Sequence, residues 1–190
     1  MRNACRTPEV TGDTTRVQKY DLMDRYCHYL RKKIRKALGD ENTPLKGMHV
    51  VVDAGNGAGG FFASQILGRL GADTSGSVFL EPDGHFPNHI PNPENKQAMA
   101  AIKKAVVDSH ADLGFIFDTD VDRMSAVLGN GREVSRNALI GMMAAILAPE
   151  YPQSTTVTDS VTSDELTEVP TKDLGLKHHR YMRGYKNVID

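Results

Sequence analysis

The sequence has no tryptophan and only two cysteines, Cys5 and Cys27, among its 190 residues. The two cysteines match no spacing typical of a zinc site or a redox motif, which favours a reduced, intracellular setting. No apolar stretch approaches the roughly 20 residues that span a bilayer. The polar N-terminus lacks the apolar core of a secretory signal. These absences predict a soluble intracellular protein with no membrane partner.

The chain also lacks an excess of charge of either sign. Its 23 basic and 24 acidic residues give a formal net charge of −1. The basic cluster at residues 31–36 lies in the last turns of an expected helix, where cations complement the helix dipole. The charge balance therefore predicts no nucleic-acid partner.

Alternating strand and helix patterns predict an α/β fold. Residues 21–38 carry apolar side chains at every fourth position, as an amphipathic helix does. Further helices are expected at residues 61–70 and from Pro93, the latter capped by Asn92. Short apolar runs predict strands, several of them buried, at residues 49–52, 77–80, 113–117 and 124–128.

A further helix, capped by Ser135, is expected to turn its apolar residues toward the core; these are Leu139, Met142, Met143, Ile146 and Leu147. Together these elements predict a three-layer αβα sandwich with a mixed sheet over residues 20–149, after a loose segment at 1–19. Residues 150–190 hold one more strand–helix–strand pattern. That is too little to cover both faces of a parallel sheet, so it predicts the truncated start of a second, incomplete α/β domain.

A glycine-rich loop after the first expected strand satisfies the G-x-G-x-x-G pattern, from Gly55 to Gly60. Glu81 lies about 20 residues further on, where a dinucleotide-binding fold places its ribose-binding acid. One interpretation is therefore a Rossmann-like dinucleotide site. The other, which we prefer, is a tight turn that packs closely within the domain, because Asp53 ends the strand where a pyrophosphate would arrive.

Three aspartates at alternate positions, Asp118, Asp120 and Asp122, follow the strand expected at 113–117, and Arg123 comes next. Carboxylates this close repel one another unless a cation joins them, and hard oxygen ligands suit Mg²⁺ or Mn²⁺. The loop is not an EF-hand, because Arg123 and Gly129 occupy the positions that need Gly and Glu. A haloacid-dehalogenase motif and a charged surface turn are weaker alternatives. The guanidinium of Arg123 is suited to a phosphate contact.

Three motifs in order resemble the α-D-phosphohexomutases, which include the phosphoglucomutases, phosphomannomutases and phosphoglucosamine mutases. They are residues 51–59, the Pro- and His-containing loop at 86–94, and residues 111–123. The match corresponds to the second of the family's four domains and the start of the third. The usual family loop is Asp-Gly-Asp-Gly-Asp-Arg, and here Thr119 and Val121 replace its glycines.

The resemblance implies that Asp118, Asp120 and Asp122 hold Mg²⁺, that Arg123 contacts the phosphoryl group, and that the substrate is a hexose phosphate. The family's phosphoserine loop and sugar-recognition loop do not occur in this sequence. The resemblance therefore implies a chain that is inactive alone. A non-catalytic interaction module, able to associate with itself through the incomplete sheet, remains an alternative. His89 is expected either to anchor its loop or to reach a neighbouring domain or substrate.

Overall fold

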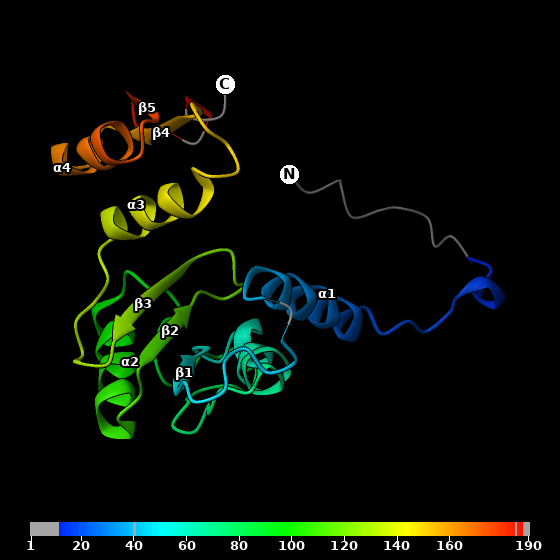
Figure 1. The fold of residues 1–190 in the computed structure, drawn as a ribbon. Helices are drawn as coiled ribbons and strands as arrows, with labels where there is room; N and C mark the ends of the chain where they lie inside the picture. Colours follow the sequence, from blue (N-terminus) through cyan, green and yellow to red (C-terminus); the bar gives the residue numbers. More distant parts are fainter. Residues whose placement is uncertain (1–11, 40, 185, 188–190) are drawn as a thin grey trace, which may run out of the picture.

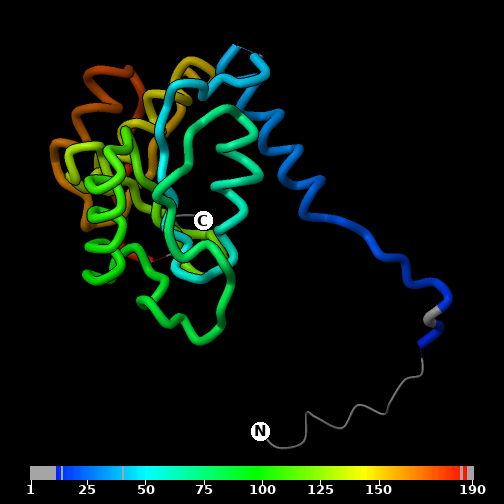
Figure 2. The backbone as a smooth tube through the Cα atoms, turned by 90° about the horizontal axis from the view of Figure 1, so that it is seen from below, coloured from blue at the N-terminus to red at the C-terminus, as the bar shows by residue number. Residues whose placement is uncertain are grey.

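The computed structural model describes residues 12–39, 41–184 and 186–187. Cys5 and Tyr185 lie outside these ranges, and the loose segment expected at 1–19 can be compared only from Gly12 onward. A single turn, η1 (Thr14–Arg16), precedes the first long helix. Figure 2 shows this part of the chain running away from the body of the molecule. None of the helices in the described ranges is long and apolar enough to cross a membrane.

The first unit contains a three-stranded sheet in the order β1-β2-β3 (Figure 1). The strands β1 and β2 are parallel, and β2 and β3 are antiparallel, so the sheet is mixed as predicted. The elements of this unit are α1 (Leu22–Ala37), β1 (Val50–Asp53), η2 (Ala58–Gly60), η3 (Phe62–Leu67), η4 (Gly68–Leu70), α2 (Lys96–Ser109), β2 (Leu113–Phe117) and β3 (Met124–Leu128).

Apolar side chains on both faces of the sheet produce the layered arrangement. On one face, Val51 and Ile116 pack against Ile102 and Val106 of α2. On the other face, the π-helix η3 covers the sheet and α1 packs on η3 in turn. The helical periodicity of α1 makes this possible, because it places Cys27, Leu30 and Ile34 on the buried side. The α/β fold with helices on both faces of a mixed sheet is confirmed.

Two local predictions in this unit are wrong. Residues 77–80 form no regular strand; only a bridge from Val78 to Asp53 remains, and Phe79 adopts a left-handed conformation with φ of 53° that interrupts any extended run. Helix α2 begins at Lys96, capped by Asn95, whose side chain accepts from the backbone of Gln97 and Ala98. The side chain of Asn92 instead closes a turn onto the N–H of Glu94.

The second part of the chain contains α3 (Arg136–Leu147), β4 (Thr155–Asp159), α4 (Asp164–Glu168), η5 (Val169–Asp173) and β5 (Lys177–Tyr181). The strands β4 and β5 form a parallel pair. Ser135 caps α3 as predicted, its side chain accepting from Ala138. Figure 1 shows α3 lying apart from the first sheet and next to α4.

The prediction that the apolar residues of α3 face the core is wrong. Met142 and Met143 are each 50% exposed, Ile146 is 58% exposed and Leu147 is 42% exposed. Helix α3 contacts α4 and η5, whereas the first sheet is already covered by α2 and η3. An apolar helix outside a filled core keeps its apolar residues at the surface.

Gly60 lies where the helical layer packs closely against the backbone of Leu80. A Cβ atom at this position would lie 1.9 Å from the carbonyl oxygen of Leu80. We expect Gly60→Ala to lower the free energy of unfolding by about 3 kcal/mol, because backbone atoms must move apart. Gly84→Ala is the control, since its Cβ would meet no atom within 4 Å. Urea unfolding of both variants measures the difference, and equal stabilities would contradict this packing.

Candidate metal centre

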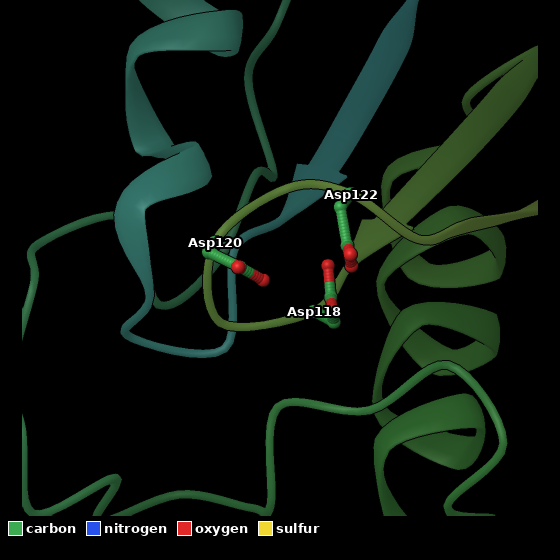
Figure 3. Close-up of side chains that lie close together, drawn as sticks. All are labelled: Asp118, Asp120 and Asp122. Carbon is green, nitrogen blue, oxygen red and sulfur yellow. The ribbon is translucent and has the colours of Figure 1, made fainter.

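The aspartate loop joins two neighbouring strands at one edge of the sheet. Asp118 directly follows β2, and β3 begins after Arg123. The side chains of Asp118, Asp120 and Asp122 each offer an oxygen, and these oxygens all lie within 4.8 Å of one another. In Figure 3 the carboxylates of Asp118 and Asp122 lie close together, and that of Asp120 points inward from the opposite side of the loop. The structure therefore brings together the three residues that the sequence predicts as ligands.

Arg123 fixes the buried member of this group. The side chain of Asp118 is only 1% exposed, and it accepts two hydrogen bonds of 2.9 Å, from the backbone N–H and from Nε of Arg123. The N–H of Asp118 donates to the carbonyl of Arg123 at 3.2 Å, which closes the loop. Both Arg123 and Asp122 remain exposed. Arg123 thus holds Asp118 in place and presents the rest of its guanidinium outward.

The three carboxylates influence one another electrostatically. The hydrogen bond to Asp118 and the charge of Asp120 raise the pKa of Asp122. Burial acts to raise the pKa of Asp118, but hydrogen bonds from the Arg123 backbone, from Asp122 and from the Arg123 side chain outweigh burial and lower it. One carboxylate is therefore held as an anion beside another that resists ionisation. A divalent cation relieves this kind of crowding.

The backbone of the loop keeps a conformation that suits glycine although glycine is absent. Val121 has a φ of 68°, a left-handed value that is rare for a β-branched residue. Its side chain packs against the core cluster that contains Val52 and Phe117. The apolar contact offsets the backbone strain. Val121 thus adopts a left-handed conformation at the position where the family pattern has its second glycine.

The glycine loop packs against the aspartate loop. The N–H of Ala58 donates to the carbonyl of Thr119 at 2.9 Å, and a Cβ atom on Gly57 would lie 2.7 Å from the same oxygen. A Cβ atom on Gly59 would lie 2.9 Å from the ring of Phe117. Close approach of backbone to backbone therefore explains these glycines. The tight-turn interpretation accounts for them without a bound pyrophosphate.

A buried pair, Asp53 and His89, lies next to the glycine loop and is hydrogen-bonded to it through Gly55. Nε2 of His89 lies 3.0 Å from Oδ2 of Asp53, and both side chains are almost completely buried. Burial raises the pKa of Asp53, and His89 opposes this effect. Oδ1 of Asp53 also accepts from the N–H of Gly55 at 2.8 Å. His89 therefore anchors its loop within this unit.

Sequence reasoning did not connect Asp53 with His89. Asp53 ends β1 in the same way that Asp118 follows β2, and the carboxyl ends of parallel strands share one edge of a sheet. The position of Asp53 at the carboxyl end of a strand parallel to β2 therefore predicts that it lies near the aspartate loop. His89 lies 36 residues further along, and no periodic pattern links the two positions.

The donor set fits a hard divalent cation. Three carboxylates surround one small volume, and no cysteine or histidine belongs to the group. Oxygen-only ligand sets favour Mg²⁺, Mn²⁺ or Ca²⁺ over softer metals. A metal held there would neutralise charge on a phosphoryl group, and the exposed face of Arg123 could contact the same group.

Comparisons with known proteins show which family the chain resembles in sequence. Residues 24–131 match the family model described as phosphoglucomutase/phosphomannomutase, alpha/beta/alpha domain II. A phosphomannomutase/phosphoglucomutase from Pseudomonas putida is 32% identical over 162 residues, which cover 85% of this chain and 33% of the relative. A probable phosphoglucosamine mutase from Methanosarcina barkeri is 39% identical over 109 residues, covering 57% of this chain and 24% of the relative.

Solved structures show the same fold. A phosphoglucomutase/phosphomannomutase family protein from Burkholderia thailandensis superposes with a TM-score of 0.74 at 25% identity, over 90% of this chain and 35% of that one. A protein described as a putative phosphomannomutase from Thermus thermophilus gives a TM-score of 0.68 at 19% identity, over 88% of this chain and 37% of that one. The chain thus spans about a third of the length of the first relatives it matches.

Proposed function

Because the chain belongs to the phosphoglucomutase/phosphomannomutase family of α-D-phosphohexomutases, we propose that its aspartate loop binds Mg²⁺ for phosphoryl transfer on hexose phosphates. Asp118, Asp120 and Asp122 are the proposed ligands. Arg123 is the proposed contact to the phosphoryl group. The observation that carries the proposal is the convergence of three carboxylate oxygens within 4.8 Å at a loop whose buried member is fixed by Arg123.

The chain's own residues define what this loop contributes. Arg123 orients Asp118 through two hydrogen bonds, so one ligand is already in place before a cation arrives. Asp120 and Asp122 are exposed and can adjust to it. The outward part of the Arg123 guanidinium offers donors in the planar geometry that suits phosphate oxygens. Bound Mg²⁺ would supply a positive charge that stabilises the phosphoryl oxygens in transit.

We further propose that this chain has no mutase activity by itself. Neither a Thr-Ala-Ser-His-Asn phosphoserine loop nor a Gly-Glu-x-Ser-Gly-His sugar loop occurs in its sequence. Without a serine that carries the phosphoryl group, metal binding alone cannot produce turnover. The proposed setting is intracellular, which suits the free, buried thiol of Cys27. Self-association through the β4–β5 sheet is the proposed role of the second part of the chain.

Calorimetry with Mg²⁺ tests the metal site directly. The wild-type chain should release or absorb measurable heat, and a variant in which Asp118, Asp120 and Asp122 are all changed to Asn should not. Identical heats from both proteins would refute the metal site. A coupled assay of hexose-phosphate interconversion tests the second proposal, with a full-length relative as the positive control, and measurable turnover by this chain would refute inactivity.

A further inference from the structure

The backbone carbonyl of Thr119 lies between two of the proposed metal ligands. Thr119 follows Asp118 and precedes Asp120 in the chain. Its carbonyl oxygen accepts a hydrogen bond from the N–H of Ala58 at 2.9 Å. This oxygen belongs to the planar peptide unit that leads into Asp120, so a bond that fixes the oxygen also fixes the start of the Asp120 backbone. The glycine loop thus holds the aspartate loop at the position next to Asp120.

Asp120 depends on this contact more than the other two ligands do. The hydrogen bonds and ion pairs of the aspartate side chains join Asp118 and Asp122 to Arg123, and among the described residues none includes the side chain of Asp120. The side chain of Asp120 is exposed. Before a cation binds, the position of Asp120 is therefore set by its backbone.

The glycine loop is itself held in place by its neighbours. The N–H of Asn56 donates to the carbonyl of Phe79 at 2.8 Å. The buried carboxyl group of Asp53, which is paired with His89, accepts from the N–H of Gly55 at 2.8 Å. These bonds join the glycine loop to the end of β1 and to two later segments of the chain. A loop fixed in this way can act as a support for ligands on another loop.

The contact between the two loops requires the absence of a side chain at Gly57. Figure 3 shows the glycine loop, in blue-green, on the Asp120 side of the aspartate loop. Gly57 has a φ of −87° and a ψ of −161°, an extended conformation that any residue adopts. A Cβ atom there would lie 2.7 Å from the carbonyl oxygen of Thr119 and 3.0 Å from its Cα atom. Glycine is therefore needed here for the contact and not for the backbone angles.

We propose that the glycine loop positions the metal ligands, with Gly57 and the N–H of Ala58 as the positioning groups. Neither group touches the cation or the substrate, and both act on Asp120 through Thr119. Groups that orient metal ligands from outside the coordination sphere contribute about 10- to 100-fold to metal affinity. The inference rests on the proposed Mg²⁺ site of the aspartate loop. It gives the glycine pattern a role that needs no dinucleotide.

Gly57→Ala tests the contact, and Gly129→Ala is its matched control. A Cβ atom on Gly129 would lie 2.9 Å from the carbonyl oxygen of Ala111, a clash of the same kind at the opposite end of β2 and β3. Calorimetric titration with Mg²⁺ should give a dissociation constant at least about 10-fold above that of the wild-type chain for Gly57→Ala, and less than about 3-fold above it for Gly129→Ala. Urea unfolding verifies that both variants are folded.

Ala58→Pro removes the hydrogen-bond donor and tests it separately. Ala58 is the first residue of η2, a position that accepts proline because its N–H has no partner within the helical turn. Ala58→Pro should also raise the dissociation constant for Mg²⁺ at least about 10-fold. The conservative variant Ala58→Ser, which keeps the N–H, should restore it to within about 3-fold of the wild-type value. This pair decides the question if Gly57→Ala does not fold.

Amide hydrogen exchange in EDTA measures the loop contact without metal. The N–H of Ala58 should exchange at least about 10-fold faster in Gly57→Ala than in Gly129→Ala. A wild-type chain that binds no Mg²⁺ would refute the metal site itself. If the wild-type chain binds Mg²⁺, equal dissociation constants for Gly57→Ala and Gly129→Ala, or for Ala58→Pro and Ala58→Ser, would overturn the positioning role alone.

Discussion

Changing His89 to alanine should lower the free energy of unfolding by about 3 kcal/mol, because it leaves the buried carboxyl group of Asp53 without the imidazole ring that hydrogen-bonds to it. Both side chains are almost completely buried and lie 3.0 Å apart. The same carboxylate orders the glycine loop through Gly55, which in turn packs against the aspartate loop. Loss of His89 should therefore weaken the packing of the glycine loop against the aspartate loop. Chemical denaturation at neutral pH measures the effect.

The chain contains its own control for this substitution. His85 lies 3.0 Å from Asp83, the same separation as in the buried pair, but its side chain is 95% exposed. His85→Ala should therefore cost less than about 1 kcal/mol, as exposed ion pairs generally do. Equal costs for the two substitutions would show that burial does not decide the strength of the His89 pair.

The loss in His89→Ala should also depend on pH. Burial already raises the pKa of Asp53, and His89 is the charge that lowers it. Without His89 the folded-state pKa rises further above the ordinary value of about 3.9. A raised folded-state pKa means that stability is lost as pH rises from the unfolded-state value through the folded-state value. The deficit relative to the wild-type chain should therefore grow above about pH 4.

Changing Asp118 alone to asparagine should abolish most Mg²⁺ binding. Asp118 is the only buried member of the three carboxylates, and Arg123 fixes its position. We expect its loss to reduce affinity by more than the about 10- to 100-fold that removal of an outer-shell partner costs. The free energy of unfolding without metal should also fall by about 1–3 kcal/mol, because Arg123 loses a charged acceptor.

Asp122→Asn is the comparison for this prediction. Asp122 is 72% exposed, and its contact to Nε of Arg123 is 3.5 Å long. It should weaken Mg²⁺ binding less than Asp118→Asn does and leave metal-free stability nearly unchanged. Calorimetry and denaturation on the same samples separate the two effects. Equal losses of affinity in both variants would contradict the view that the pre-positioned Asp118 dominates the site.

The sequence by itself determined several of the local elements and the candidate ligands, although the strand expected at 77–80 did not form. The pattern of apolar residues located α1 and β2 correctly. A helix with one buried face has apolar residues at every third or fourth position, and a fully buried strand has a continuous apolar run. Asp118, Asp120 and Asp122 occupy one short loop, so their convergence depends on few backbone angles. The cap of α3 at Ser135 could be predicted for the same reason, because the capping side chain bonds to the backbone of a residue only three positions away.

Only the tertiary structure decided the features that join distant residues. The pairing of Asp53 with His89 spans 36 positions, and the contact of Gly57 with Thr119 joins two loops that follow different strands. The apolar face of α3 illustrates the same limit. Its pattern predicted burial but could not say against what, and α2 and η3 already fill both faces of the first sheet. Periodicity records that a face is apolar, whereas the partner of that face depends on which elements meet in space.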